Sequence, residues 1–199
     1  LENLKQNAHM TDPIKSLTHT HLVNCISTEI SRAVDTDHIR ILDAGCGNGY
    51  LMHFIFKCIS EAFPAKTVSV YGFDVFDHGV QSTGFMQRTR LFLETVSPEV
   101  DWDGRVLAFS KDDPWSFEEN FFDFIVSNQV LEHVKNKKLF FDNVHRCLKT
   151  GGNSFHLAPL IHCIQEWHIL IPFAHRFKSY EMLFAYIKTC SQIGIGKFR

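Results

Sequence analysis

The stretch ILDAGCGNGY (residues 41–50) places three glycines at alternate positions directly after an apolar run. The run predicts a strand over residues 39–44, and residues 50–62 predict a buried helix that ends before Pro64. Glycine tolerates positive φ and lets a ligand approach the backbone closely. Because the helix N-terminus also offers unpaired N–H groups, the loop predicts a site for a polar ligand with a negative terminal group.

Strands and helices alternate along the rest of the chain. We expect strands at 67–75, 104–109, 122–128 and 154–158, and helices at 13–34, within 79–97, at 136–148 and at 179–190. In the helix within 79–97 we expect Phe85, Leu91, Leu93 and Val96 to pack, and we expect Gly151 to close the helix at 136–148. Alternation of this kind is typical of βαβ units, so we expect an α/β fold with a parallel sheet, helices on both faces, and a ligand at the carboxyl ends of the strands.

Length and composition limit the class of protein. A chain of 199 residues fits one domain, and its net charge of −2 provides no general basic field for nucleic acid or an anionic membrane. No apolar run reaches membrane-spanning length, and the first ten residues lack a signal-peptide core. Six scattered cysteines form no CxxC pair, which favours free thiols. We therefore expect a cytoplasmic protein with no nucleic-acid partner and no membrane span.

Two well-known glycine loops differ from this one. The dinucleotide fingerprint G-x-G-x-x-G would need glycine at position 50, where the chain has Tyr50 and places glycine one residue earlier. A Walker loop is also excluded, because no GK[ST] follows. The observed pattern is D-x-G-x-G-x-G over residues 43–49.

That pattern resembles the first motif of class I S-adenosylmethionine-dependent methyltransferases, and further resemblances follow in order. They are VYGFDV (70–75) to the second strand, KDDPWSFEENFFDFIVSNQVLEHV (111–134) to the adenine loop and fourth strand, and LKTGGNSFHLAP (148–159) to the following turn and fifth strand. The resemblance implies a Rossmann-like, doubly wound, mostly parallel sheet that binds S-adenosylmethionine. It divides a single methyltransferase-like domain of residues 1–199 into an N-terminal helical extension (1–35), a cofactor-binding core (38–160) and a substrate-side segment (161–199).

The resemblance also implies roles for individual residues. Gly45, Gly47 and Gly49 would form the loop under the methionine part, and Asp43 would orient that loop and meet the amino group directly or through water. Asp74 would accept hydrogen bonds from both ribose hydroxyls, with Val75 beside it in the cofactor site. Of Asp112 and Asp113, either one could contact the adenine amine, with Trp115 as an apolar wall, and we assign Asp112. Asn128 and Gln129 would lie beneath the cofactor near the sulfonium.

Methyl transfer to oxygen or nitrogen needs a base as well as alignment. Histidines and glutamates occur after the fourth strand and around the fifth: Glu132, His133, His156, His162, Glu166, His168 and His175. We assign His133 and His168 as candidate catalytic residues, although the alternative is that Glu132 and His133 only cap and pack a helix. The spacing of His162, Glu166 and His168 resembles a loose metal motif, but twelve histidines make chance clusters common, and we predict no metal.

The acceptor is predicted to be a small molecule. The NPPY tetrad of many nucleic-acid methyltransferases is absent, and SNQV stands in its place. The alternative is a non-catalytic module that binds S-adenosylmethionine without transferring its methyl group. The related fold usually adds an antiparallel hairpin beside the fifth strand, and this chain ends at IGIGKFR, so we expect a sheet that lacks it. We then expect the exposed strand edge to be covered by residues 159–199 or to pair with another copy of the chain in a homo-oligomer.

Overall fold

The computed structural model describes residues 16–33, 36–75, 84–110, 113–159, 164–166 and 169–197. These residues belong to two compact units, Leu1–Ala158 and Pro159–Arg199. The first unit carries the glycine loop and all the strands of the larger sheet.

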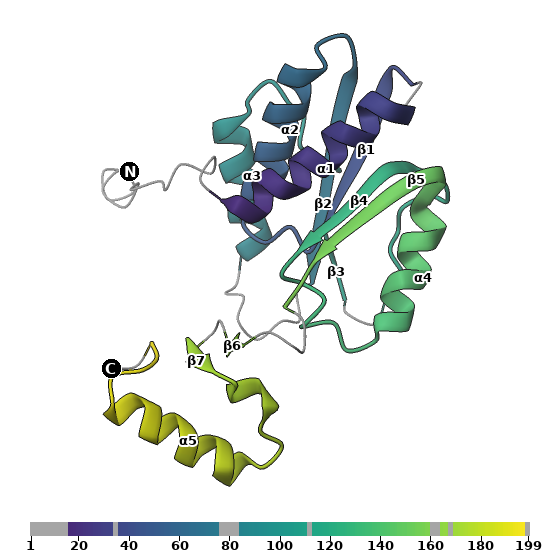
Figure 1. Cartoon of the computed structure of the whole chain (residues 1–199). Coiled ribbons are helices and arrows are strands. Elements are labelled where there is room, and N and C mark those ends of the chain that lie inside the picture. Colours follow the sequence, from purple (N-terminus) through teal and green to yellow (C-terminus); the bar gives the residue numbers. More distant parts are fainter. Residues whose placement is uncertain are drawn as a thin grey trace. The chain divides into compact units, whose positions relative to one another are not determined.

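The larger sheet has five strands, and every neighbouring pair is parallel (Figure 1). The strands are β1 (His38–Ala44), β2 (Thr67–Val75), β3 (Val106–Phe109), β4 (Phe122–Asn128) and β5 (Leu148–Leu157), in the order β3-β2-β1-β4-β5. The chain winds outward from β1 to β3 and then returns to the other side of β1 with β4. The predicted Rossmann-like, doubly wound sheet is therefore confirmed, with its switch point between the carboxyl ends of β1 and β4.

Helices cover both faces of this sheet because its strands alternate in the side chains they present. Ile39 and Ile41 of β1 belong to a core shared with α1 (Leu17–Ala33) and α2 (Tyr50–Ala62), and α3 (Phe85–Val96) adds Leu93 to it. Leu42 belongs to the opposite core, which α4 (Lys137–Cys147) covers. Figure 1 shows α1, α2 and α3 together on one side of the sheet and α4 on the other.

Most element bounds agree with the sequence predictions, and those of α2, β2 and β4 agree to the residue. Leu91 does not pack as predicted, since 62% of it is exposed. The buried positions of α3 are Thr89 and Leu93, four residues apart, and Leu91 lies on the opposite side of the helix.

The junction of α4 and β5 also differs from the prediction. Helix α4 ends at Cys147 because Leu148 is already extended (φ −78°, ψ 134°), so Gly151 does not close the helix. Gly151 lies within β5 at φ 81°, and the strand begins six residues earlier than predicted. At the start of β3 the difference is smaller, since that strand begins at Val106 instead of residue 104.

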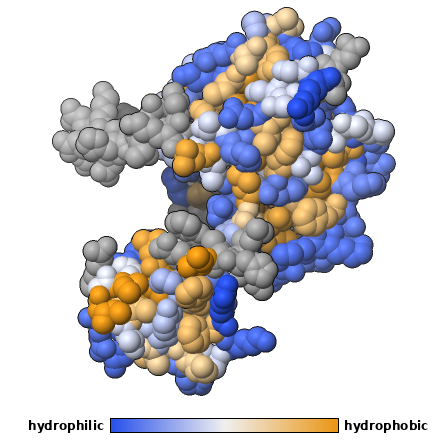
Figure 2. All heavy atoms as spheres, in the orientation of Figure 1, coloured by the Kyte–Doolittle hydropathy of each residue, from blue (hydrophilic) through white to orange (hydrophobic). Residues whose placement is uncertain are grey.

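The second unit has a small core of its own. A short antiparallel pair, β6 (Gln165–Glu166) with β7 (Ile171–Pro172), precedes a 3-10 turn (Ala174–Arg176) and helix α5 (Tyr180–Gln192). The helix was predicted, and Ser179 caps it by accepting a hydrogen bond from the Met182 amide. Figure 2 shows apolar residues on the surface of this unit, and its exposed apolar side chains include Tyr180, Met182, Phe184 and Ile193.

Strand β5 forms one edge of the larger sheet. Within the described ranges its only strand neighbour is β4, so no hairpin pairs with its outer edge there. Coverage of that edge by residues 159–199, or by another copy of the chain, stays a prediction. Among the described helices, none is both long and apolar enough to cross a membrane.

Candidate functional site

The glycine loop between β1 and α2 requires its glycines for two different reasons. Gly45, Gly47 and Gly49 all have positive φ, at 89°, 53° and 81°. A Cβ on Gly45 would lie 2.5 Å from Val130 Cγ2, and one on Gly49 would lie 3.0 Å from Leu93 Cγ. A Cβ on Gly47 would meet no atom within 4 Å. The first and third glycines therefore permit internal packing, whereas the second leaves open space above the backbone.

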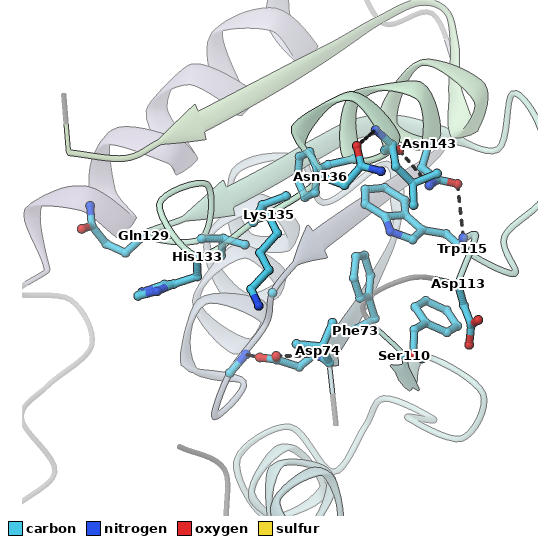
Figure 3. A pocket seen from close by; sticks show the side chains of 18 of the residues that line it. Phe73, Asp74, Ser110, Asp113, Trp115, Gln129, His133, Lys135, Asn136 and Asn143 are labelled. Atoms are coloured by element: carbon cyan, nitrogen blue, oxygen red, sulfur yellow. Dashed lines mark hydrogen bonds between the residues drawn. The ribbon is translucent and has the colours of Figure 1, made fainter. Parts of the chain in front are cut away.

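Asp74, at the carboxyl end of β2, holds this loop (Figure 3). Its Oδ2 accepts a hydrogen bond from the Gly47 amide at 2.8 Å, and its Oδ1 accepts one from the Val75 amide at 2.7 Å. Thr89 of α3 donates its hydroxyl to the Gly47 carbonyl at 2.8 Å. Because each carboxylate oxygen has two acceptor positions, Asp74 retains capacity for two further donors.

Asp43, the last residue but one of β1, is a buried acid. Its side chain is 1% exposed, and neither of its oxygens has a hydrogen-bond partner in the described part of the chain. Burial, and then repulsion from Asp74, raise the pKa of Asp43 to about 8. The carboxyl is therefore mostly protonated at neutral pH in the free protein, and a nearby cation would favour its ionisation.

A cavity of about 570 Å³ opens beside the loop (Figure 3). It is bounded by the ends of β2, β3 and β4 and by the beginning of α4. Its lining residues are Gly45, Gly47, Phe73, Asp74, Val75, Phe109, Ser110, Asp113, Trp115, Asn128, Gln129, Val130, His133, Val134, Lys135, Asn136, Leu139, Phe140 and Asn143. The cavity therefore lies at the switch point, where ligands bind in sheets of this kind.

Trp115 forms an aromatic wall of the cavity. It is 7% exposed, and its ring centroid lies 4.6 Å from that of Phe73 and 5.3 Å from that of Phe140. Its amide donates to Asn143 Oδ1 at 3.2 Å, and Arg146 Nη2 donates to its carbonyl at 2.6 Å. Two residues of α4 thus fix the backbone that carries the indole, which belongs both to the core and to the wall.

The end of β4 forms the opposite wall. Gln129 has φ 58°, unusual for a residue other than glycine, and its amide donates to the Leu157 carbonyl at 2.7 Å. Asn128 Nδ2 donates to Thr18 Oγ1 of α1 at 3.3 Å, whereas Asn128 Oδ1 is buried without a partner among the described residues. Backbone held in a sparsely populated conformation is often found at functional sites.

The structure brings most of the predicted site residues together. Gly45, Gly47, Asp74, Val75, Asn128, Gln129 and His133 line the cavity, as do Asp113 and Trp115. Asp43 and Gly49 are not among its lining residues, and Gly49 serves as the N-cap of α2. Two predicted residues, Asp112 and His168, lie outside the described residues.

Sequence reasoning missed the wall formed by α4 and by the two residues that precede it. Lys135, Asn136, Phe140 and Asn143 line the cavity but belong to none of the motifs that indicated the site. In Figure 3 the Lys135 side chain extends into the cavity, on the side where Asp74 lies. The only local signal is Asn136, whose Oδ1 accepts from the Leu139 amide and caps α4.

The other candidate bases are dispersed. His156 of β5 hydrogen-bonds Ser127 Oγ through Nδ1 at 2.8 Å, and burial lowers its pKa. His175 belongs to the second unit. His162 and the side chain of Glu166 lie outside the described residues. Within the described ranges, no group of three or more His, Cys, Asp or Glu residues is placed to hold a metal ion.

The strand order, the loop and the cavity together define the Rossmann-like fold of class I S-adenosylmethionine-dependent methyltransferases. A family model described as a methyltransferase domain matches residues 19–193, and the chain belongs to this family.

The solved structures of two carbon methyltransferases show the same fold at low sequence identity. The CurJ carbon methyltransferase is 16% identical, with a TM-score of 0.52 over 68% of this chain and 33% of its own. The DszA carbon methyltransferase is 16% identical, with a TM-score of 0.51 over 74% of this chain and 38% of its own. A methyltransferase from Methanococcus maripaludis, described as S-adenosyl-L-methionine-dependent, is 15% identical, with a TM-score of 0.48 over 89% and 66%. The chain thus spans less than two thirds of each, and no curated protein matches its sequence.

Proposed function

We propose that this protein is a cytoplasmic enzyme that transfers the methyl group of S-adenosylmethionine to a small-molecule acceptor. The observation that carries the proposal is the meeting of an open glycine backbone and a carboxylate at one wall of the switch-point cavity. Asp74 holds the Gly47 amide there and keeps acceptor positions for further donors. When bound, S-adenosylmethionine supplies a methyl group activated by a positively charged sulfur.

The residues present fit the parts of this molecule. The free acceptor positions of Asp74 suit two ribose hydroxyls, and the open space over Gly47 leaves room for the methionine part. Asp43 is a buried acid with unfilled acceptors, which suits an ammonium group reached directly or through water. Trp115 and Phe73 suit the adenine ring. Its amine would be met by Asp113, which lines the cavity, or by Asp112, which lies outside the described residues.

The reacting end is assigned to the β4 wall. Asn128 and Gln129 would border the sulfonium, and His133 on the following turn is exposed and lines the same cavity, so it is a candidate base. His168 is kept as the second candidate base. The net charge of −2 supports a small acceptor over nucleic acid, because phosphate backbones are bound chiefly by clustered positive charge.

Calorimetric titration with S-adenosylmethionine and with S-adenosylhomocysteine tests this proposal. Both should bind, and Asp74→Ala should weaken binding about 10- to 100-fold, because ribose hydroxyls lose a charged acceptor. Asp142→Ala is the control, since that carboxylate lies on the exposed surface of α4 and pairs with Lys138. Asp74→Ala also removes the acceptor of the Gly47 amide, so a melting curve of each variant shows whether affinity is lost through unfolding of the loop or through the missing contact with the ribose.

Three results would contradict the proposal in different ways. Unchanged affinity in Asp74→Ala would remove Asp74 from the site. Failure of both compounds to bind, with binding of a nicotinamide dinucleotide, would identify a different class of enzyme. Tight binding without turnover on a panel of amines, alcohols and carbon acids would favour the non-catalytic binding module.

A further inference from the structure

The first turn of α1 is hydrogen-bonded to the end of β4. Thr18 accepts a hydrogen bond from Asn128 Nδ2 at 3.3 Å, across 110 residues of sequence. Ser16 fixes this turn, because its hydroxyl lies 3.1 Å from Thr18 Oγ1 and accepts from the His19 amide at 3.4 Å. The ring of His19 lies against Phe54 of α2, with centroids 6.1 Å apart. The turn therefore has a fixed position beside the strand end to which we assign the sulfonium.

Several hydrogen-bonding atoms on these elements are buried without a partner in the described structure. They are Asn128 Oδ1, His19 Nδ1 and both carboxylate oxygens of Glu132. Glu132 follows Asn128 by four residues, on a turn that the His133 amide closes by donating to the Val130 carbonyl at 2.9 Å. Buried polar atoms in native proteins are nearly always paired, so unpaired atoms on adjoining elements indicate a missing ligand.

The chemistry of these atoms restricts that ligand. An amide oxygen and a carboxylate accept hydrogen bonds and cannot donate them. Burial lowers the pKa of His19, so its imidazole is neutral at pH 7 and one ring nitrogen can accept. A molecule that satisfies this set must offer several N–H or O–H donors, and a positive charge would be favoured by the carboxylate.

We propose that Thr18, His19, Asn128 and Glu132, here called the α1–β4 polar set, bind the methyl acceptor, and that this acceptor is an amine or hydroxyl compound. The inference rests on the proposed function, because it places the set beside the transferred methyl group. As a lone pair on the acceptor's nitrogen or oxygen forms a bond to the methyl carbon, the carbon–sulfur bond breaks and its electron pair moves to sulfur. The acceptor's proton passes to the neutral imidazole of His19, which becomes an imidazolium.

The natural acceptor is not needed for a test. The cofactor analogue sinefungin carries an amino group on carbon where S-adenosylmethionine carries its methyl group on sulfur, and S-adenosylhomocysteine has nothing at that position. The ratio of their dissociation constants therefore reports what surrounds the methyl position, separately from the rest of the cofactor site. The wild-type protein should bind sinefungin about 10-fold more tightly or better, because its ammonium meets the unfilled acceptors.

Two variants assign that preference to the proposed residues. Glu132→Gln keeps the shape and removes the charge, and it should lower the preference at least about 5-fold. His19→Phe keeps the ring on Phe54 and removes its nitrogens, and it should lower the preference about 3-fold or more. His21→Phe is the matched control, because His21 is exposed on the same helix, two residues further on. All three variants should keep the wild-type affinity for S-adenosylhomocysteine.

The two levels of the proposal fail in different ways. Equal binding of both compounds by the wild type overturns the α1–β4 polar set and leaves the proposed function standing. A preference that survives in both Glu132→Gln and His19→Phe does the same. Failure of S-adenosylhomocysteine itself to bind overturns the proposed function and this inference with it.

Discussion

Replacing the buried acid Asp43 with asparagine should make the ligand-free protein more stable, relative to the wild type, as the pH rises. Asp43 is 1% exposed, its oxygens have no partner among the described residues, and Asp74 repels its charge. Asparagine has nearly the same shape and carries no charge. It therefore leaves the packing of β1 in place and removes only the ionisation equilibrium.

The magnitude follows from the raised pKa. Unfolding lowers the pKa of Asp43 from about 8 to an ordinary value of 3.8. Between these pH values the folded state holds a proton that the unfolded state releases. Each pH unit of increase therefore lowers the free energy of unfolding of the wild type by about 1.4 kcal/mol. The stabilisation of the folded wild type by the proton on Asp43 is complete below pH 3.8 and is lost progressively as the pH rises. At pH 7 the free energy of unfolding is therefore about 4 kcal/mol smaller than below pH 3.8. The Asp43→Asn variant has no such loss, because its amide does not titrate.

Urea denaturation of both proteins at pH 5.5, 6.5, 7.5 and 8.5 measures this difference. The free energy of unfolding of Asp43→Asn minus that of the wild type should increase by about 1.4 kcal/mol per unit up to pH 7.5 and then level off. Other titrating groups are common to both proteins and cancel. In the same variant, affinity for S-adenosylhomocysteine should fall, because the amide cannot balance an ammonium charge. A stability difference that does not vary with pH would show that Asp43 is solvated or paired, and would refute the reasoning.

Two further perturbations test the loop and the aromatic wall. Gly45→Ala should lower the free energy of unfolding by about 2–4 kcal/mol, from its positive φ and its contact with Val130. Adding Val130→Ala should recover the part of this loss that is due to the contact. The control is Gly151→Ala, which has a similar φ in open space and should lower the free energy of unfolding by only about 1–2 kcal/mol. Equal losses for both glycines in urea denaturation would exclude the contact. Arg146→Met should lower the free energy of unfolding by about 2–3 kcal/mol and weaken S-adenosylhomocysteine binding several-fold, because the Trp115 carbonyl loses its donor. Wild-type affinity of this variant in calorimetry would show that the indole needs no such support.

The sequence by itself determined the elements and the loop. The bounds of α2, β2 and β4 follow from apolar periodicity, which is a local property of 7 to 13 residues. The position of Asp74 at the end of β2 could be predicted for the same reason, and the glycines at 45, 47 and 49 are read directly from the sequence. The alternation of strands and helices predicted a parallel α/β sheet, and the resemblance of the ordered motifs to those of class I methyltransferases implied its Rossmann-like topology.

Tertiary structure alone decided what surrounds that loop. Val130 lies over Gly45, Asn143 and Arg146 hold Trp115, and Thr18 meets Asn128, and none of these contacts has a signature in the neighbouring sequence. They arise because β4 inserts beside β1 and brings α1 and α4 to opposite sides of one strand end. Local propensity reaches only a few residues along the chain, whereas these contacts depend on the order of strands in the sheet, and that order is fixed by burying both of its faces.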